Sequence, residues 1–575
     1  MSFLEIRDLT FTYAGGIRAV DGLSLDARQG EFLALIGPNA AGKSTLALLM
    51  KGMLKPDKGH ILAGGYEVLP GMPNPRVGIL FSNPENQIVT SIVEEDIAFS
   101  LEVAAQPPET IHKKVHGIMD ELGIRHLEKK MPHLLSGGEQ QLVALSGVLV
   151  LEPEVLILDE PTTFLDPDGK AAVMSALRDV ASRGKTVILI THDLSEACLA
   201  DRVVLMEKGQ IVQDDPPMVF FRKGSERNRS GMKPPFLVGL SLALEREGVR
   251  IANPMDMEEV SSVLKRMADR KSTSQWQDEK SPASEVEGAK AINFSKIWFR
   301  YGLPKREEPD LLRGLELGIP ERSFSMICGR NGSGKSTLLQ MANGLVSPDR
   351  GTVFFRGQPL TALAKKPGSI PAKIALLFQN PERQLFSDTV FEDIAFGPRN
   401  LVLGVKEVRK RVLEACEWAG LDVGLLERPI HSLSGGQMRK AGIAGVLGMN
   451  PSVLILDEPT DGLDPEGAKE FFQRAVAFRD AREATVLVAA HKVPDQISAV
   501  DHFHHLEGGV IRSSGSTRKT LTGAQRTLAD RYLPDHLRLQ ERLLCAQVLP
   551  GQVELDPAVA RKKLLSLVVK GRTGP

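Results

Sequence analysis

The stretch GPNAAGKST at residues 37–45 occurs a second time as GRNGSGKST at residues 329–337. Both copies fit the pattern G-x-x-x-x-G-K-[ST], whose glycines let a loop wrap phosphate groups with its backbone N–H groups pointing inward. In this pattern the lysine reaches the terminal phosphates, and the hydroxyl that follows it ligates Mg²⁺. Since such a loop joins a strand to a helix, the sequence predicts two phosphate-binding sites on an α/β fold, centred on Lys43 and Lys335.

Other segments repeat in the same order and at nearly the same distance. VLILDEP occupies residues 155–161 and 453–459, and an LSGG sequence begins at Leu135 and again at Leu433. A repeat of this length means that one structural unit occurs twice. We therefore expect two homologous halves joined head to tail: a first half that carries residues 37–45, and a second half that carries the other copy.

Strand and helix patterns alternate within each half. EFLALIG, SFSMICG, VLILDE and TVILITH are short apolar runs suited to strands that are buried on both faces. Apolar residues recur at helical spacing in the segment 108–124, which predicts an amphipathic helix that packs on the core. The residues on this face are Ile111, Val115, Ile118, Met119 and Leu122. The expected fold is α/β with a mostly parallel sheet core, a helical signature subdomain and a small C-terminal accessory segment, twice.

A weaker repeat follows each half, where MKPPFLVGLSLALEREG in the first resembles YLPDHLRLQERLL in the second. We expect these to be small helical accessory segments. RKSTSQWQDEKSPASEVEGAKA between the halves is polar and too poor in apolar residues to fold alone, which is typical of a linker. The expected domains are 1–228, an accessory segment 229–269, a linker 270–291, a second domain 292–512 and a C-terminal accessory segment 513–575.

An acidic pair follows a buried strand in each half, as Asp159-Glu160 and Asp457-Glu458. The aspartate is placed to hold Mg²⁺ through its water shell, and the glutamate is placed to polarise a water that attacks phosphate. Capping of a following helix is the alternative role for either acid. The phosphate loop in the same half favours the catalytic role.

The LSGG sequences match the capping-box pattern that opens a helix. Ser136 pairs with Glu139 in this pattern, and Ser434 pairs with Gln437. The paired glycines leave the helix N–H groups open to an anion, so a phosphate could dock there, although a simple helix cap would look the same.

The overall composition indicates no particular binding partner, and it argues against some classes of protein. The chain of 575 residues has 71 Lys and Arg against 72 Asp and Glu, with no long block of one sign that would indicate a nucleic-acid-binding tail. Its four cysteines form no C-x-x-C pair, which argues against a zinc site and a disulfide framework and fits a reducing cytosol. The start has no secretory leader pattern, and no window approaches the roughly 18 apolar residues of a spanning helix. We expect no membrane crossing by the chain itself.

The order of phosphate loop, LSGG, apolar-DE and a later histidine resembles the ATP-binding-cassette ATPases over nearly the whole chain. The resemblance implies ATP and Mg²⁺ as cofactors, and two halves packed head to tail so that each ATP lies between the phosphate loop of one half and the LSGG of the other. Site one would use Tyr13 to stack adenine, then Gly37, Pro38, Asn39, Ala40, Ala41, Gly42, Lys43, Ser44, Thr45, Asp159, Glu160 and His192, with Ser434, Gly435 and Gly436 across the interface. Site two would use Tyr301, Gly329, Arg330, Asn331, Gly332, Ser333, Gly334, Lys335, Ser336, Thr337, Gln379, Asp457, Glu458 and His491, with Ser136, Gly137 and Gly138 opposite. Mg²⁺ would be held by Ser44 and Asp159 in one site and by Ser336, Gln379 and Asp457 in the other, and the two histidines would sense the terminal phosphate.

The segments SNPENQIVTSIVEEDIAFSLE and QNPERQLFSDTVFEDIAFGPRN are similar to those of energy-coupling-factor importers and cobalt or nickel importers, in which N-P-x-x-Q follows the glutamine loop. The resemblance implies a protein at the cytoplasmic face of the membrane that drives a transmembrane coupling protein and a membrane protein that binds a vitamin or metal ion. A tandem translation factor of the ribosome-associated type is the alternative. Such proteins carry a long, highly charged linker, whereas the linker here is short and of mixed charge.

The two predicted sites differ at two positions. Ser82 stands where the second half has Gln379, the glutamine that reaches Mg²⁺ and the attacking water in the family. Phe164 stands where the second half has Gly462, in a loop that the family places at the dimer interface. We therefore expect site one to bind ATP but to turn it over more slowly than site two.

Overall fold

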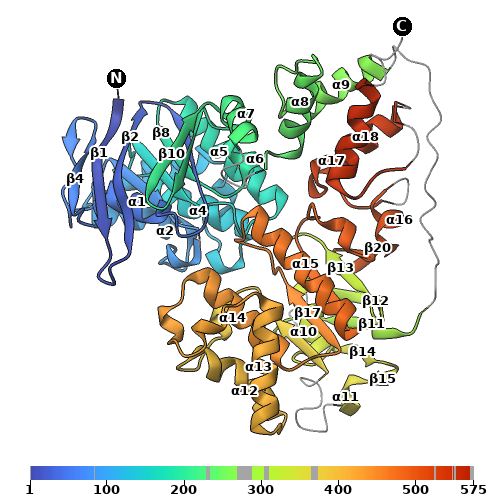
Figure 1. Cartoon of the computed structure of the whole chain (residues 1–575). Helices are drawn as coiled ribbons and strands as arrows, with labels where there is room; N and C mark the ends of the chain where they lie inside the picture. The colour runs from blue at the N-terminus through green and yellow to red at the C-terminus, as the bar shows by residue number, and fades with distance from the viewer. Residues whose placement is uncertain are drawn as a thin grey trace. The chain divides into compact units, whose positions relative to one another are not determined.

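The computed structural model describes residues 2–82, 84–227, 233–268, 288–302, 310–363, 373–522, 526–546, 548–549 and 552–569. The chain divides into two compact units, Met1–Gly239 with Gly462–Glu466, and Leu240–Asp461 with Gly467–Pro575. Each unit carries one copy of the repeated sequence and has its own sheets and core (Figure 1).

The first half contains a large, mostly parallel sheet and a smaller antiparallel one. The large sheet has the order β10-β9-β3-β8-β7-β6, and its β10–β9 pair is antiparallel. The small sheet has the order β2-β1-β4-β5. The strands are β1 (Ser2–Thr12), β2 (Arg18–Arg28), β3 (Phe32–Ile36), β4 (Lys58–Ala63), β5 (Tyr66–Glu67), β6 (Val77–Leu80), β7 (Val155–Asp159), β8 (Thr186–Ile190), β9 (Arg202–Glu207) and β10 (Gln210–Asp215). The mostly parallel sheet expected from the apolar runs is confirmed.

The core of the first half lies between the two sheets, around α1 (Lys43–Lys51). Leu4 of the small sheet, Leu46 of the helix and Ile157 of the large sheet belong to one buried cluster. Every residue of β3 and β8 is buried, because the large sheet is covered on both faces. Burial of α1 on its apolar face fixes the phosphate loop that precedes it.

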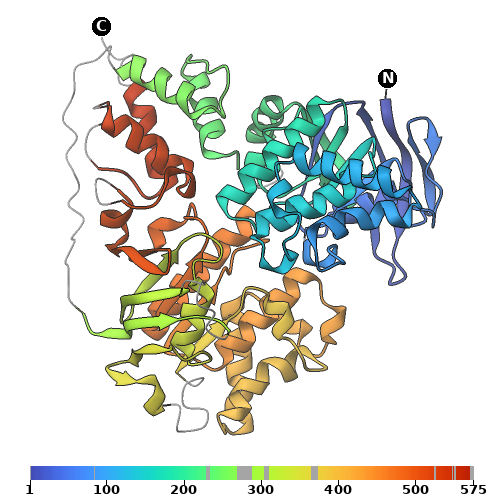
Figure 2. The same cartoon turned by 180° about the vertical axis from the view of Figure 1, so that it is seen from behind.

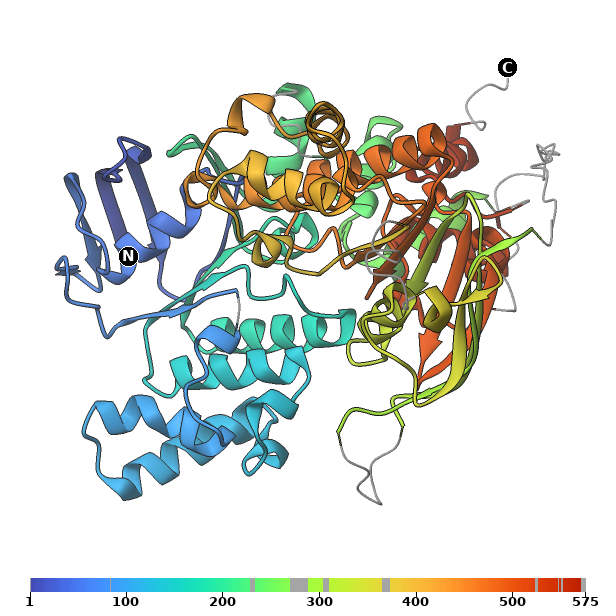
Figure 3. The same cartoon turned by 90° about the horizontal axis from the view of Figure 1, so that it is seen from below.

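Three further helices, α2 (Val93–Val103), α3 (Pro108–Glu121) and α4 (Gly137–Leu149), pack on one another. Figure 3 shows α2 and α3 in light blue, apart from the dark-blue strands of the small sheet. The amphipathic helix predicted from the segment 108–124 is α3, which buries Val115, Ile118 and Met119, so this prediction is confirmed. The remaining helices of the first half are α5 (Pro167–Ser182), α6 (Leu194–Ala197) and α7 (Pro217–Arg227).

The second half repeats this architecture. Its large sheet has the order β20-β19-β13-β18-β17-β16, and its small sheet has the order β12-β11-β14-β15. The strands are β11 (Lys290–Phe299), β12 (Leu312–Pro320), β13 (Phe324–Cys328), β14 (Arg350–Phe355), β15 (Gln358–Pro359), β16 (Ile374–Leu377), β17 (Val453–Asp457), β18 (Thr485–Ala490), β19 (His502–Glu507) and β20 (Val510–Ser516). The helices are α10 (Lys335–Asn343), α11 (Leu360–Leu363), α12 (Val390–Asn400), α13 (Val405–Ala419), α14 (Gly435–Gly448), α15 (Pro465–Arg482) and α16 (Thr517–Leu521).

Helices also occupy the two segments expected to be accessory. They are α8 (Phe236–Arg246) and α9 (Met257–Ala268) after the first half, and α17 (Asp535–Cys545) and α18 (Pro557–Val569) at the end of the chain. Within the second unit α9 packs against α17 and α18, as the views in Figures 1 and 2 both show. Arg542 of α17 also pairs with Glu258 of α9.

The predicted linker 270–291 lies outside the described residues except for its last four positions, where β11 begins. Among the helices that the structure describes, none combines the length and the apolar character needed to cross a membrane.

Candidate active sites

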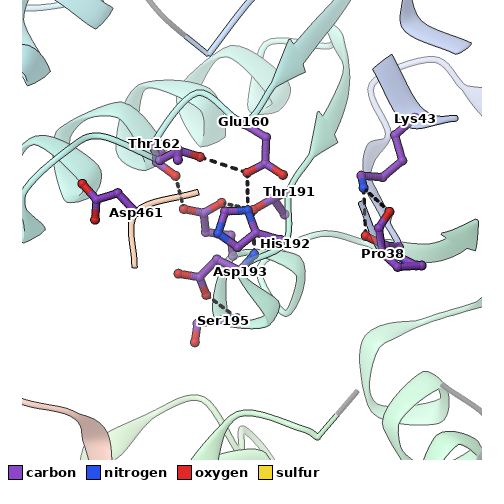
Figure 4. Close-up of polar contacts among 12 residues, drawn as sticks. Pro38, Lys43, Glu160, Thr162, Thr191, His192, Asp193, Ser195 and Asp461 are labelled. Atoms are coloured by element: carbon purple, nitrogen blue, oxygen red, sulfur yellow. Dashed lines mark hydrogen bonds and ion pairs between the residues drawn. The ribbon is translucent and has the colours of Figure 1, made fainter. Parts of the chain in front are cut away.

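The first phosphate loop connects β3 to α1 and is closed by its own lysine. Nζ of Lys43 donates to the carbonyl oxygens of Gly37 at 2.8 Å and of Pro38 at 3.0 Å (Figure 4). Gly42 has φ of 99°, and a Cβ there would lie 2.1 Å from the carbonyl oxygen of Ala19, so this position requires glycine. Burial lowers the pKa of Lys43. The amino group of Lys43 thus lies inside the phosphate loop and is held there by the carbonyl groups of the loop.

The second phosphate loop has the same geometry between β13 and α10. Nζ of Lys335 donates to the carbonyl oxygens of Gly329 at 2.8 Å and of Arg330 at 3.1 Å. One difference is that Ala40 of the first loop has φ of 63°, where the second loop has Gly332 at φ of 74°. The left-handed region costs an alanine more than a glycine, so the first loop is the more strained of the two.

The two tyrosines expected to stack adenine occupy equivalent positions next to the phosphate loops. The hydroxyl of Tyr13 lies 3.1 Å from Oγ1 of Thr45, and the hydroxyl of Tyr301 lies 3.1 Å from Oγ1 of Thr337. Tyr13 is 42% exposed and Tyr301 is 57% exposed, which leaves area for a base. An exposed aromatic ring anchored beside a phosphate loop is suited to stacking.

The residues proposed to bind Mg²⁺ fit a hard cation. A hydrogen bond joins Asp159 to Ser44, and another joins Asp457 to Ser336. Burial raises the pKa of Asp159 above its ordinary value and raises the pKa of Asp457 to about 6. Oδ1 of Asp457 is buried and has no hydrogen-bond partner among the described residues. Carboxylate and hydroxyl oxygens are the donors that Mg²⁺ prefers, and the bound ion would neutralise charge on the phosphates.

Glu160 and His192 meet at the ends of neighbouring strands in the first half (Figure 4). Nδ1 of His192 lies 2.7 Å from Oε2 of Glu160, and Oγ1 of Thr163 donates to the same oxygen at 3.0 Å. Burial opposes protonation of His192, but the hydrogen bond and charge of Glu160 raise its pKa above the ordinary value. Glu160 has φ of 54°, a conformation that is uncommon for non-glycine residues. Where such residues do occur, they cluster at functional sites.

The equivalent pair in the second half is more deeply buried. Oε2 of Glu458 accepts hydrogen bonds at 3.0 Å from the backbone N–H and from Nδ1 of His491. Oε1 of Glu458 lies 3.4 Å from Nζ of Lys335, and Oδ1 of Asp461 lies 3.7 Å from Nδ1 of His491. Burial opposes ionisation of Glu458, but the His491 charge lowers the pKa of the carboxyl below its ordinary value. The carboxylate of Glu458 therefore contacts both the ring of His491 and Nζ of Lys335.

Both LSGG sequences open helices through capping boxes, as the sequence predicts. Oγ of Ser136 accepts from the N–H of Glu139 at 3.4 Å, and a carboxylate oxygen of Glu139 accepts from the N–H of Ser136 at 2.9 Å. Ser434 and Gln437 form the same pair at the start of α14. The first residues of α4 and α14 are glycines, so their N–H groups are not shielded by side chains.

The loop after β6 is tied down at both ends. Oε1 of Gln87 accepts from the N–H of Phe81 at 2.9 Å, next to Ser82. Oδ1 of Asp96 accepts from the N–H of Val89 at 2.7 Å and of Thr90 at 2.9 Å. The glutamine of N-P-x-x-Q thus holds the start of the loop against the strand, and Asp96 of α2 holds the end of the loop. Val89, at that end, is 66% exposed.

The second half repeats these contacts. Oε1 of Gln384 accepts from the N–H of Phe378 at 3.3 Å, and Oδ1 of Asp393 accepts from the N–H of Phe386 at 2.9 Å. Phe386 is 66% exposed and forms an edge-to-face pair with the half-exposed Phe396, their ring centroids 4.8 Å apart. Both halves therefore expose an apolar side chain at the same loop position.

The structure also shows polar residues that the sequence reading missed. Glu196, Lys170 and Asp193 surround the segment of His192, and Asp461 lies beside His491. Their one signal in the sequence is nearness to the acidic pair or to the histidine. Asp461 directly precedes Gly462 in the TDGLDP loop, whereas the contact between Lys170 and Glu196 forms only when separate segments pack together.

The fold and these residues define a tandem P-loop nucleoside triphosphatase, and comparison with known proteins names its family. The ABC transporter family model matches residues 20–163 and 312–461, about half of the chain. The chain is 33% identical over 551 residues to a predicted ABC transporter ATP-binding protein of Bifidobacterium longum, covering 90% of the chain and 66% of that longer protein. It is 31% identical over 543 residues to a protein of the same description from Caldanaerobacter subterraneus, covering 91% of the chain and 93% of that protein.

Solved structures are also similar, among them that of cbiO1 from Clostridium perfringens, part of the ABC transporter complex cbiONQ. It is 35% identical and covers 39% of this chain and 95% of that chain, with a TM-score of 0.36.

The chain belongs to the ABC transporter family. It is an ATPase with two ATP-binding cassettes, and such cassettes bind ATP, typically with Mg²⁺. The family resemblance expected from the phosphate loops and the LSGG sequences is confirmed. The roles of individual site residues stay proposals.

Proposed function

We propose that this chain is the ATPase of an energy-coupling-factor type importer, with both ATPase subunits fused in one chain. The observation that carries the proposal is the loop after β6 and its equivalent after β16. Each loop has the N-P-x-x-Q sequence typical of that group, is tied down by equivalent hydrogen bonds and ends in an exposed apolar residue. A loop that is held by hydrogen bonds and exposes apolar side chains is suited to binding another protein.

ATP binding would close the two halves and hydrolysis would reopen them, so that the loops move a transmembrane coupling protein bound at Val89 and Phe386. A second membrane protein would bind the solute, a vitamin or a metal ion. The chain would then lie at the cytoplasmic face of the membrane through its partners.

Tagged chain isolated from its own cells tests this proposal. Membrane proteins identified by mass spectrometry should copurify with the wild type in mild detergent and should be lost from Val89→Glu and Phe386→Glu. Tyr66→Glu changes an aromatic side chain that is 63% exposed in the small sheet and serves as the matched control. ATP binding should be unchanged in all three variants. Copurification of ribosomes without membrane proteins would contradict the proposal and favour the translation-factor class.

We also propose that the halves pair head to tail, so that Ser434 completes site one and Ser136 completes site two. The capped helix starts at both serines support an anion-binding role. Cysteines introduced at the exposed Asn39 and Ser432, with Cys545→Ser to remove an exposed native thiol, should crosslink when ATP and Mg²⁺ are present. Tethering gives an effective concentration of about millimolar, so the crosslink should form within one chain even at high dilution. Crosslinks between separate chains alone would contradict intramolecular pairing.

A further inference from the structure

A buried carboxylate connects three separate segments of the first half. Glu196 of α6 is 1% exposed, and its carboxylate accepts a hydrogen bond from Oγ1 of Thr162 and another, at 2.7 Å, from Oγ1 of Thr191. Nζ of Lys170, on α5, lies 3.0 Å from the same carboxylate. A carboxylate taken out of water is costly unless it is paired and fully hydrogen-bonded, and Glu196 meets both conditions.

Lys170 lies between two carboxylates. Its Nζ also pairs with Asp193, whose Oδ1 accepts from the N–H of Ser195 at 2.9 Å and whose own N–H donates to Oγ1 of Thr191 at 3.0 Å. Burial opposes protonation of Lys170, but the charges of Asp193 and Glu196 raise its pKa above the ordinary value. One hydrogen-bonded network thus surrounds Glu196, made of the side chains of Lys170, Thr162, Thr191 and Asp193. Figure 4 shows the two threonines, Asp193 and Ser195.

This network holds both segments that carry the proposed hydrolytic residues. Thr191 and Asp193 are the sequence neighbours of His192 on either side, and Thr162 follows Glu160 by two positions. Glu160 has the left-handed backbone described above, a conformation that persists only where the surroundings fix it. Fixing the residues on each side of His192 and just after Glu160 fixes the distance between the two functional groups.

The second half has no equivalent of this network at the corresponding positions. Ala468, Ala490, Lys492 and Asp495 stand where the first half has Lys170, Thr191, Asp193 and Glu196. There Glu458 and His491 are buried together with Asp461 instead. The two halves therefore hold equivalent acid and histidine residues by different means.

We propose that Glu196 is a positioning residue for ATP hydrolysis in the first half: with Lys170, it holds the Thr162 and Thr191 segments so that Glu160 and His192 keep their geometry. This inference rests on the assignment of Glu160 and His192 as the hydrolytic residues of site one. This role requires no contact between Glu196 and the phosphates. Its loss should slow the chemical step without weakening ATP binding.

The test uses the full chain with Glu458→Gln, which removes the second hydrolytic glutamate, and single-turnover cleavage of γ-labelled ATP by an excess of chain. Adding Glu196→Gln to the Glu458→Gln chain should lower the cleavage rate constant by roughly tenfold to a hundredfold. A loss of this size is expected when a catalytic group is misplaced by about 1 Å. The affinity for ATP, measured by filter binding, should stay within about twofold of the parent chain. The melting temperature of the first half with ATP bound should stay within a few degrees of the parent value. Asp495→Asn, in a Glu160→Gln chain, is the matched control and should leave cleavage unchanged.

Thr162→Val provides a second variant if Glu196→Gln prevents folding, because it removes one donor to the carboxylate and keeps the side-chain shape. It should lower the cleavage rate constant by a smaller factor and leave ATP affinity unchanged. An unchanged rate in either folded variant, or an equal loss of rate and affinity, would overturn the inference. If Glu160→Gln itself leaves cleavage unchanged in the Glu458→Gln chain, the assignment of site one fails instead, and the inference fails with it.

Discussion

Nζ of Lys335 lies 3.4 Å from Oε1 of Glu458, and both side chains are buried. The lysine of the phosphate loop and the glutamate of the acidic pair, 123 positions apart in the chain, thus meet in the site proposed for the second half. In the first half Lys43 likewise donates to the carbonyls of its own loop and Glu160 likewise pairs with a histidine, but the side chain of Glu160 is 22% exposed whereas that of Glu458 is 7% exposed. The same residue types therefore occupy the two sites with different burial.

Lys43→Ala and Lys335→Ala should each weaken ATP binding at one site, because each removes a fixed charge from a preformed loop. A hydrogen bond to a charged group is worth about 1.5–3 kcal/mol, which corresponds to a loss of affinity of roughly tenfold or more. Calorimetric titration with ATP and Mg²⁺ should show two binding events in the wild type and one strong event in each variant. Unchanged titrations would show that the loops do not bind ATP.

Tyr13→Ala and Tyr301→Ala should weaken ATP binding through loss of stacking, by about 1–3 kcal/mol if the ring behaves like other aromatic platforms for bases. Tyr13→Phe and Tyr301→Phe are the matched controls: they lose the hydroxyl contact to Thr45 or Thr337 but keep the ring. Affinity near that of the wild type is expected for both phenylalanine variants. If the phenylalanine and alanine variants lose equal affinity, the hydroxyl matters and adenine stacking is wrong.

His504 makes the stability of the second half depend on pH. Burial and the charge of His502 lower the pKa of His504 to about 3, and its Nδ1 contacts Oγ of Ser514 at 2.8 Å. Because the unfolded chain binds a proton near pH 6.5 and the folded chain does not, His504 costs no stability above that pH and destabilises the fold as pH falls toward 3. At pH 5 the loss is about 2 kcal/mol.

His504→Val tests this prediction, because Val204 occupies the equivalent position in the first half. Urea unfolding midpoints should fall less between pH 7 and pH 5 in the variant than in the wild type. Equal falls in the two proteins would mean that His504 does not titrate as its burial requires.

Local sequence patterns predict the parts of the sites that depend on local backbone geometry. The phosphate loops, the capping boxes at Ser136 and Ser434 and the strands that end at Asp159 and Asp457 each involve a few consecutive residues. Their physical requirements, such as glycine at φ > 0 or a hydroxyl at a helix start, can be recognised from the sequence without the tertiary structure.

Contacts between distant segments could not be predicted in the same way. Glu196 meets Lys170 and Thr162 only after α5, β8 and the segment after β7 have packed together. The packing of α9 on α17 and α18 likewise depends on which apolar faces remain free once each sheet is covered. Helical periodicity predicts that such a face is buried but not what covers it.

The comparison of Glu160→Gln with Glu458→Gln tests most directly the central claim that both cassettes hydrolyse ATP and that the second does so faster. Steady-state ATPase activity of the chain, assembled with the membrane partners proposed above, should fall in both variants and should fall further in Glu458→Gln. Glu458 lies in the half that has Gln379, and it lies 3.4 Å from Lys335, whereas Glu160 lies in the half that has Ser82. Ser82→Gln should narrow the difference. Equal losses from the two glutamate variants, or no loss from either, would contradict the account.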